Sequence, residues 1–211
     1  FAQVLNQIGS EAPDMISSVT IKKCFYLIQH LLTSHIYSGH DKSDGGLMTT
    51  LTEMAIAGNV GFNINLPPEE KSYMKYLWNE EAGIVIEVQN KTVKYVTNCL
   101  NINEIQNFVL GTTNERGTIT IQHNKEVLLN TTVHIMREIW ESTSFELEKL
   151  QCNPECVKEE FDSMKDFAYK NERYYDCKLN VNTTSLIQNM DPLNLPPESK
   201  NNPLVAIIRE E

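Results

Sequence analysis

The stretch Ser38–Leu47, with the sequence SGHDKSDGGL, limits the possible folds of this chain more than any other stretch. The apolar residues Ile36 and Tyr37 before it are typical of a strand end. The pair Gly45-Gly46 permits a sharp turn or a close approach of the backbone to a ligand. Four apolar residues then recur at helical spacing: Leu47, Leu51, Met54 and Ala55. They predict a helix, and we predict Gly58 as its C-terminal cap.

A strand, a polar loop with glycines and a helix can present backbone amides and a carboxylate to a Mg²⁺-bound phosphate. A His-Asp pair before two glycines also fits a plain turn whose Asp or Ser caps the helix. We interpret Asp44 as such a cap and His40 as a histidine packed at a strand end, because no partner for it is visible at useful spacing. Glu53, on the following helix, is interpreted as structural.

Composition limits the possible partners. A net charge of -10 and a pI near 5.0 argue against broad, charge-driven binding of nucleic acid, but not against nucleotides, whose charge Mg²⁺ can offset. No apolar run is long enough to span a membrane, and no signal-peptide pattern is visible. The five cysteines are scattered, which favours reduced thiols. We therefore expect a cytoplasmic protein without nucleic-acid or membrane partners and, because it begins at Phe1, an excised piece.

Periodicity predicts strands that alternate with helices, followed by a meander. Turns at 114–117 and 123–125 are predicted to join strands as hairpins. The pattern indicates an α+β domain with one mixed, mostly antiparallel sheet and packed helices. Predicted helices cover residues 1–8, 19–33 and 69–78, with a long one starting at 130–132, and predicted strands cover 60–66, 84–88, 118–122 and 126–129.

Composition changes after residue 170. Asn, Pro, Ser and Lys dominate the following residues, so we predict a domain at 1–170 and a linker at 171–202. Residues 203–211 become strongly β-like and resemble the first strand of a further domain.

Several motifs, in order, resemble the phosphoribosylformylglycinamidine synthase family. They are FAQVLNQIG with APD, SGHDKSDGGLMTTLTEMAIAGNVGF, WNEEAG with GIVIEV, MREIWESTSFELEKL, NPECVKEEF and LVAIIREE. Loops like the second motif occur throughout the aminoimidazole ribonucleotide synthetase superfamily, so the resemblance implies the C-terminal domain fold of that superfamily. WESTS, NPEC and the LVAIIREE tail indicate the narrower family, with the tail as the start of its glutaminase domain.

The resemblance implies an ATP-dependent ligase with glutamine as amido donor. Members convert formylglycinamide ribonucleotide, glutamine and ATP into formylglycinamidine ribonucleotide, glutamate, ADP and phosphate in purine biosynthesis. This chain resembles the last lobe of the second half of the synthetase core, between the preceding lobes and the glutaminase. That half holds an auxiliary nucleotide site. On the family's motif, Asp41 corresponds to a Mg²⁺ ligand and Ser43 to a contact with the nucleotide, ATP or ADP.

The resemblance implies no catalytic residue in this chain, which we therefore expect to be inactive alone. One departure is Ser142, where the family commonly has a second acidic residue, so no role of that carboxylate is transferred. The alternative is a purely structural lobe that binds no nucleotide. The helical face of Arg137, Trp140, Glu141 and Thr143 fits either a domain interface or an ordinary mixture of core and surface.

Overall fold

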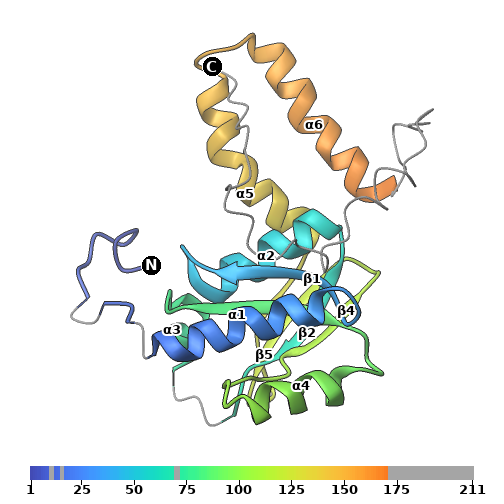
Figure 1. Ribbon diagram of the computed structural model, residues 1–211. Helices are drawn as coiled ribbons and strands as arrows, with labels where there is room; N and C mark the ends of the chain where they lie inside the picture. The colour runs from blue at the N-terminus through green and yellow to red at the C-terminus, as the bar shows by residue number, and fades with distance from the viewer. Residues whose placement is uncertain (10–11, 15–16, 69–71, 171–211) are drawn as a thin grey trace, which may run out of the picture. The chain divides into compact units, whose positions relative to one another are not determined.

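The structure, a computed structural model, describes residues 1–9, 12–14, 17–68 and 72–170, shown in Figure 1. These belong to one compact unit, residues 1–170. The predicted linker 171–202 and strand 203–211 lie outside the described residues. The elements are α1 (Ser18–Leu32), β1 (Ile36–Lys42), α2 (Gly46–Gly58), β2 (Gly61–Asn65), α3 (Tyr73–Trp78), β3 (Gly83–Val88), α4 (Val93–Ile102), β4 (Gly111–Asn114), β5 (Thr118–His123), β6 (Glu126–Thr132), α5 (Val133–Glu148) and α6 (Pro154–Lys170).

The larger sheet has four strands in the order β4-β2-β5-β6. β2 pairs antiparallel with β4 and parallel with β5, so the turn at 114–117 joins two strands that are not neighbours. The predicted hairpin there is wrong, whereas the turn at 123–125 does connect the paired strands β5 and β6. Gly61 allows β2 to enter between the two strands, because a Cβ at this position would collide with the backbone of Thr118.

A second sheet consists of β1 and β3, paired antiparallel. The fold is thus α+β with both parallel and antiparallel pairing, as predicted, but its strands form two sheets rather than one. β1 continues through His40 and Asp41 to Lys42, with Asp41 opposite Ile84. Asp41 therefore lies in the strand rather than in the loop that follows.

Two apolar cores lie on these sheets. The larger core joins α2, α3 and the start of α5 to β2 and β5; its buried side chains are Leu47, Leu51, Ala55, Phe62, Ile64, Leu66, Leu77, Ile119, Ile121 and Val133. The smaller core lies where α1 and α4 meet β1 and β3; its buried side chains are Leu31, Val96, Leu100 and Ile105, with Ile36, Ile86 and Val88 packed against them. The loop between β1 and α2 connects the two regions.

Several element ends differ from the predictions. The first residues form turns rather than a helix, and Ile8 is fully exposed, so this short segment lacks the packing that stabilises a helix. Asn59 rather than Gly58 caps α2 in the left-handed region. α3 starts at Tyr73, and a regular helix, α4, occupies a stretch that the pattern left undecided.

The long helices α5 and α6 pack against each other through the rings of Phe145 and Phe161, whose centroids lie 4.3 Å apart. Figure 1 shows them as a pair of antiparallel helices. Thr132 caps α5 by accepting a hydrogen bond from the backbone N–H of Ile135, where the sequence predicted a helix start. None of the helices in the described part of the chain is long and apolar enough to cross a bilayer.

Candidate functional site

The candidate site lies where β1 ends and α2 begins. The side chain of Asp41 is 76% exposed, so its carboxylate is available to a ligand. Its backbone carbonyl accepts hydrogen bonds from Thr50 Oγ1 at 3.2 Å and His40 Nδ1 at 2.7 Å. The backbone of Asp41 is therefore held firmly although its side chain faces solvent.

Thr50 links the end of β1 to the first turn of α2. Its side chain is almost fully buried, and its hydroxyl lies 3.0 Å from the carbonyl oxygen of Gly46 as well as within reach of Asp41. Burying a hydroxyl is favourable only when it is hydrogen-bonded, which explains a threonine among the apolar residues of α2. The site thus rests on the larger core.

The two glycines of the loop are required by its backbone. Gly45 and Gly46 have φ values of 79° and 65°, in the left-handed region that favours glycine. A Cβ on Gly46 would lie 2.8 Å from the carbonyl oxygen of Asn79. The second glycine therefore lets the start of α2 approach the end of α3.

Glu80 stabilises this loop through a hydrogen bond that the sequence did not predict. Its Oε1 accepts a hydrogen bond of 2.9 Å from the backbone N–H of Gly45. The N-cap of α2 is Gly45 itself, without a side-chain cap, so the prediction that Asp44 caps the helix is wrong. Glu80 lies in the motif WNEEAG, to which the sequence analysis assigned no role beyond the family resemblance.

His40 has partners, contrary to the prediction. Its Nε2 lies 3.2 Å from Oε2 of Glu53, one helical turn after Thr50 on α2. Glu53 was predicted to be structural, but its contact with His40 was not predicted. Glu53 follows His40 by 13 residues, and only the packing of α2 against β1 brings them together.

Lys42 is the cation nearest to the loop along the chain. Burial lowers the pKa of its ammonium group, because desolvation disfavours the charged form, and the nearby carboxylate of Glu81 partly opposes this shift. The lysine stem packs against Gly83, where an added Cβ would lie 3.3 Å from its Cε. The ammonium group of Lys42 therefore lies near Glu81, in the connection between α3 and β3.

Residues 3–124 match the model of the family described as AIR synthase related protein, C-terminal domain. That range contains both sheets up to the end of β5 and the whole of the β1–α2 loop. The chain belongs to this family. Helices α5 and α6 lie beyond the matched range of the AIR synthase-related domain.

Two curated relatives that are similar to this chain are named as phosphoribosylformylglycinamidine synthases. The chain is 33% identical over 211 residues, all of its length, to "Probable phosphoribosylformylglycinamidine synthase, chloroplastic/mitochondrial" of Arabidopsis thaliana. It is 37% identical over 163 residues to phosphoribosylformylglycinamidine synthase of Homo sapiens, which covers 75% of this chain. The chain spans 14% and 12% of the length of these two relatives.

Solved structures of T. maritima PurL are similar to this chain in part. PurL complexed with ATP matches with a TM-score of 0.48 and 10% identity over 56% of this chain and 21% of PurL. PurL complexed with FGAR matches with the same TM-score and 13% identity, over 56% of this chain and 20% of PurL.

As a metal site, the end of β1 offers the exposed carboxylate of Asp41. Within the ranges that the structure describes, no three His, Cys, Asp or Glu side chains are grouped to hold an ion. Mg²⁺ binds hard oxygen ligands and usually keeps several waters, so the exposed carboxylate of Asp41 fits the role of a single ligand. Ser43 is exposed directly after β1, close in the chain to this carboxylate.

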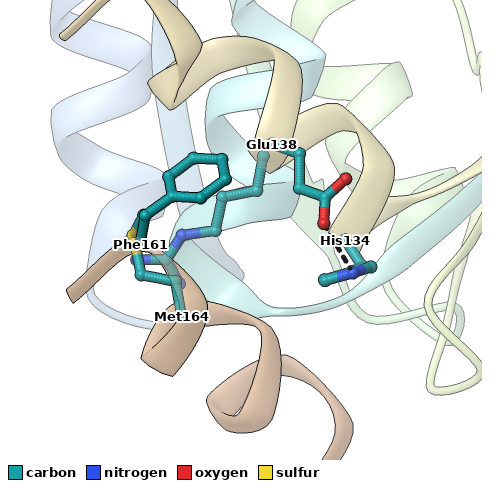
Figure 2. A pocket seen from close by; sticks show the side chains of 5 residues that line it. His134, Glu138, Phe161 and Met164 are labelled. Carbon is teal, nitrogen blue, oxygen red and sulfur yellow. Dashed lines mark ion pairs between the residues drawn. The ribbon is translucent and has the colours of Figure 1, made fainter. Parts of the chain in front are cut away.

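Two hollows elsewhere do not suit a nucleotide. The one between α5 and α6, drawn in Figure 2, is lined by His134, Arg137, Glu138, Phe161 and Met164 and has a volume of about 10 Å³, room for about one water. A wider groove of about 260 Å³ is lined by residues 65–68 and 108–110, which include no ionisable side chain. The exposed carboxylate at the end of β1 therefore remains the candidate site.

Proposed function

We propose that this chain is part of a phosphoribosylformylglycinamidine synthase, the last lobe of the second half of its synthetase core. The observation that carries the proposal is 33% identity over all 211 residues to a relative of that name. Residues 1–170 form the lobe, residues 171–202 a linker and residues 203–211 the start of the glutaminase domain.

The parent enzyme uses ATP and glutamine to convert formylglycinamide ribonucleotide into formylglycinamidine ribonucleotide. Asp41 provides one oxygen ligand to Mg²⁺, and Ser43 contacts a phosphate of the nucleotide. The bound ion offsets phosphate charge, which an acidic chain with a net charge of -10 does not do by itself. The remaining ligands come from the preceding lobes of the same polypeptide.

The site is an auxiliary one that holds ADP, and the isolated chain is inactive because it contributes a single Mg²⁺ ligand and no glutaminase nucleophile. The parent enzyme is cytoplasmic, although the Arabidopsis relative is named as chloroplastic/mitochondrial. Its partners are the substrates, the preceding lobes and the glutaminase domain.

An alternative is a structural lobe that binds no nucleotide. Exposed apolar side chains favour it, because a contiguous apolar surface often marks an interface. Phe25 and Tyr26 are exposed on α1, and Ile135, Ile139 and Trp140 are exposed on α5. A thermal shift of the complete protein with Mg-ADP separates the two functions. Stabilisation of the wild type that is lost in Asp41→Asn supports a binding lobe, and no stabilisation that depends on Asp41 supports a scaffold.

The decisive test uses the complete protein that contains this chain, as wild type and as Asp41→Asn. Glutamine-dependent synthesis of formylglycinamidine ribonucleotide tests the family assignment, and counting the nucleotide retained after purification tests the site. We expect an active wild type and an Asp41→Asn variant that loses its retained nucleotide. An inactive wild type contradicts the assigned reaction, whereas a variant that keeps its nucleotide leaves Asp41 as a strand residue only.

A further inference from the structure

His40 and Asp41 are neighbours on β1, and their side chains come close together at the end of the strand. The side chain of His40 is 32% exposed and turns toward α2, while the carboxylate of Asp41 faces solvent. An exposed carboxylate alone samples several directions. What fixes its direction is therefore the backbone from which it projects.

The carbonyl of Asp41 lies within hydrogen-bond distance of two side chains, and His40 makes the shorter of the two contacts. A carbonyl oxygen only accepts, so Nδ1 of His40, at 2.7 Å, carries the hydrogen. Thr50 also reaches this carbonyl, but its single hydroxyl hydrogen is shared with the carbonyl of Gly46. The contact from Thr50 to this carbonyl, at 3.2 Å, is therefore the weaker of the two.

The opposite side of the imidazole is held by Glu53. Its Oε2 lies 3.2 Å from Nε2 of His40, and because a carboxylate only accepts, this contact is a hydrogen bond when Nε2 also carries a hydrogen. A turn of the ring about its Cβ–Cγ bond would break the contacts at both nitrogens. Thr50 and Glu53 are three residues apart and lie on the same face of α2. That face therefore supports the end of β1 at two points.

We infer that His40, held in place by Glu53, is a positioning residue for the carboxylate of Asp41. The hydrogen bond from Nδ1 fixes the peptide plane that follows Asp41 and, with the β-pairing to Ile84, the direction of its side chain. Nδ1 also lies 3.5 Å from Oδ1 of Asp41, so the ring lies beside the carboxylate as well as beside the backbone. This inference rests on the proposed role of Asp41 as a Mg²⁺ ligand.

The chain supplies a matched control for this arrangement. On α5, Nε2 of His134 lies 3.2 Å from Oε1 of Glu138, the same separation as between His40 and Glu53. Figure 2 shows this second pair beside the small cavity between α5 and α6. Both residues of this pair lie on α5, away from β1. Breaking the pair therefore tests whether loss of any His–Glu pair changes metal binding.

The experiment measures Mn²⁺ binding by electron paramagnetic resonance in the complete protein that contains this chain, with ADP present. The site is defined as the bound Mn²⁺ that disappears in Asp41→Asn. We expect Glu53→Gln and His40→Leu to weaken binding at this site about 10-fold, as loss of a partner behind a metal ligand usually does. His40→Asn, whose amide can take the place of Nδ1, should recover part of the loss, and Glu138→Gln should bind as the wild type.

The outcomes separate this inference from the proposal on which it rests. If Asp41→Asn binds as much Mn²⁺ as the wild type, the proposed site is wrong and the positioning role falls with it. If Asp41→Asn loses the site while Glu53→Gln and His40→Leu bind normally, the site stands and the positioning role is overturned. Should His40→Leu fail to fold, Glu53→Gln decides, because glutamine preserves the size of the side chain.

Discussion

The two cores differ in size and in what they support. The larger one fills the space between α2, α3, α5 and the four-stranded sheet, whereas the smaller one joins α1 and α4 to the two-stranded sheet. The candidate Mg²⁺ ligand is carried by the smaller region, on β1, but its backbone is fixed by α2 of the larger region. The exposed strand end therefore derives its rigidity from the neighbouring core.

The largest expected effect comes from the centre of the larger core. Ile121 is 1% exposed on β5, and Ile121→Ala should lower the free energy of unfolding by about 3–5 kcal/mol because it removes buried atoms and leaves a cavity. Leu100→Ala, at the edge of the smaller core, should cost about 2–3 kcal/mol. Urea unfolding of both variants checks this order, and equal losses would contradict the distinction between the two cores.

The second prediction concerns the start of α2. Gly46→Ala should cost about 2–4 kcal/mol, because alanine disfavours φ of 65° and its Cβ meets the backbone of Asn79. Gly117→Ala is the matched control, since φ is 67° there and a Cβ would have nothing within 4 Å. It should lose only about 1–2 kcal/mol of conformational strain. Equal costs for the two variants, measured by thermal unfolding, would show that the contact between α2 and α3 contributes little.

The third prediction tests the link between the two regions. Thr50→Val should cost about 1–2 kcal/mol, because it removes the hydroxyl that reaches both Asp41 and Gly46. Thr52→Val is the control: Thr52 is also buried, but its hydroxyl donates to the carbonyl of Met48 within the same helix. We expect this control to lie within about 0.5 kcal/mol of the wild type in urea unfolding. If Thr52→Val costs as much, the link to β1 is not what makes Thr50 important.

Sequence patterns predicted the helices and strands well where the apolar periodicity lies within a single segment. The repeat of Leu47 and Leu51 predicted α2, and the apolar run around Ile86 predicted β3. The family motif supplied the candidates Asp41 and Ser43. The part that could not be predicted depends on packing between distant segments: β2 enters between β4 and β5, Glu80 reaches back 35 residues to Gly45, and Glu53 meets His40.

The last and smallest expected effect is on the alkylation rate of Cys24, a residue of α1 that packs against the smaller core. Burial raises the pKa of its thiol, because desolvation disfavours the thiolate, whereas Cys152 and Cys156 are exposed. Iodoacetamide at pH 8.5 should therefore label Cys24 more slowly than these two cysteines, with the difference vanishing in urea; peptide mass spectrometry separates the sites. Equal rates without urea would mean that the smaller core opens freely.

The same pKa shift gives a pH dependence of known sign. With the thiol pKa higher in the folded state than in the unfolded state, the folded chain binds more protons above the unfolded value, about 8.5. The stabilising contribution is complete below that pH and is lost as the pH rises through the folded-state pKa. Cys24→Ala should therefore lose less stability than the wild type between about pH 8 and pH 10. A parallel decline of both chains in urea unfolding would show that the smaller core does not bury this thiol.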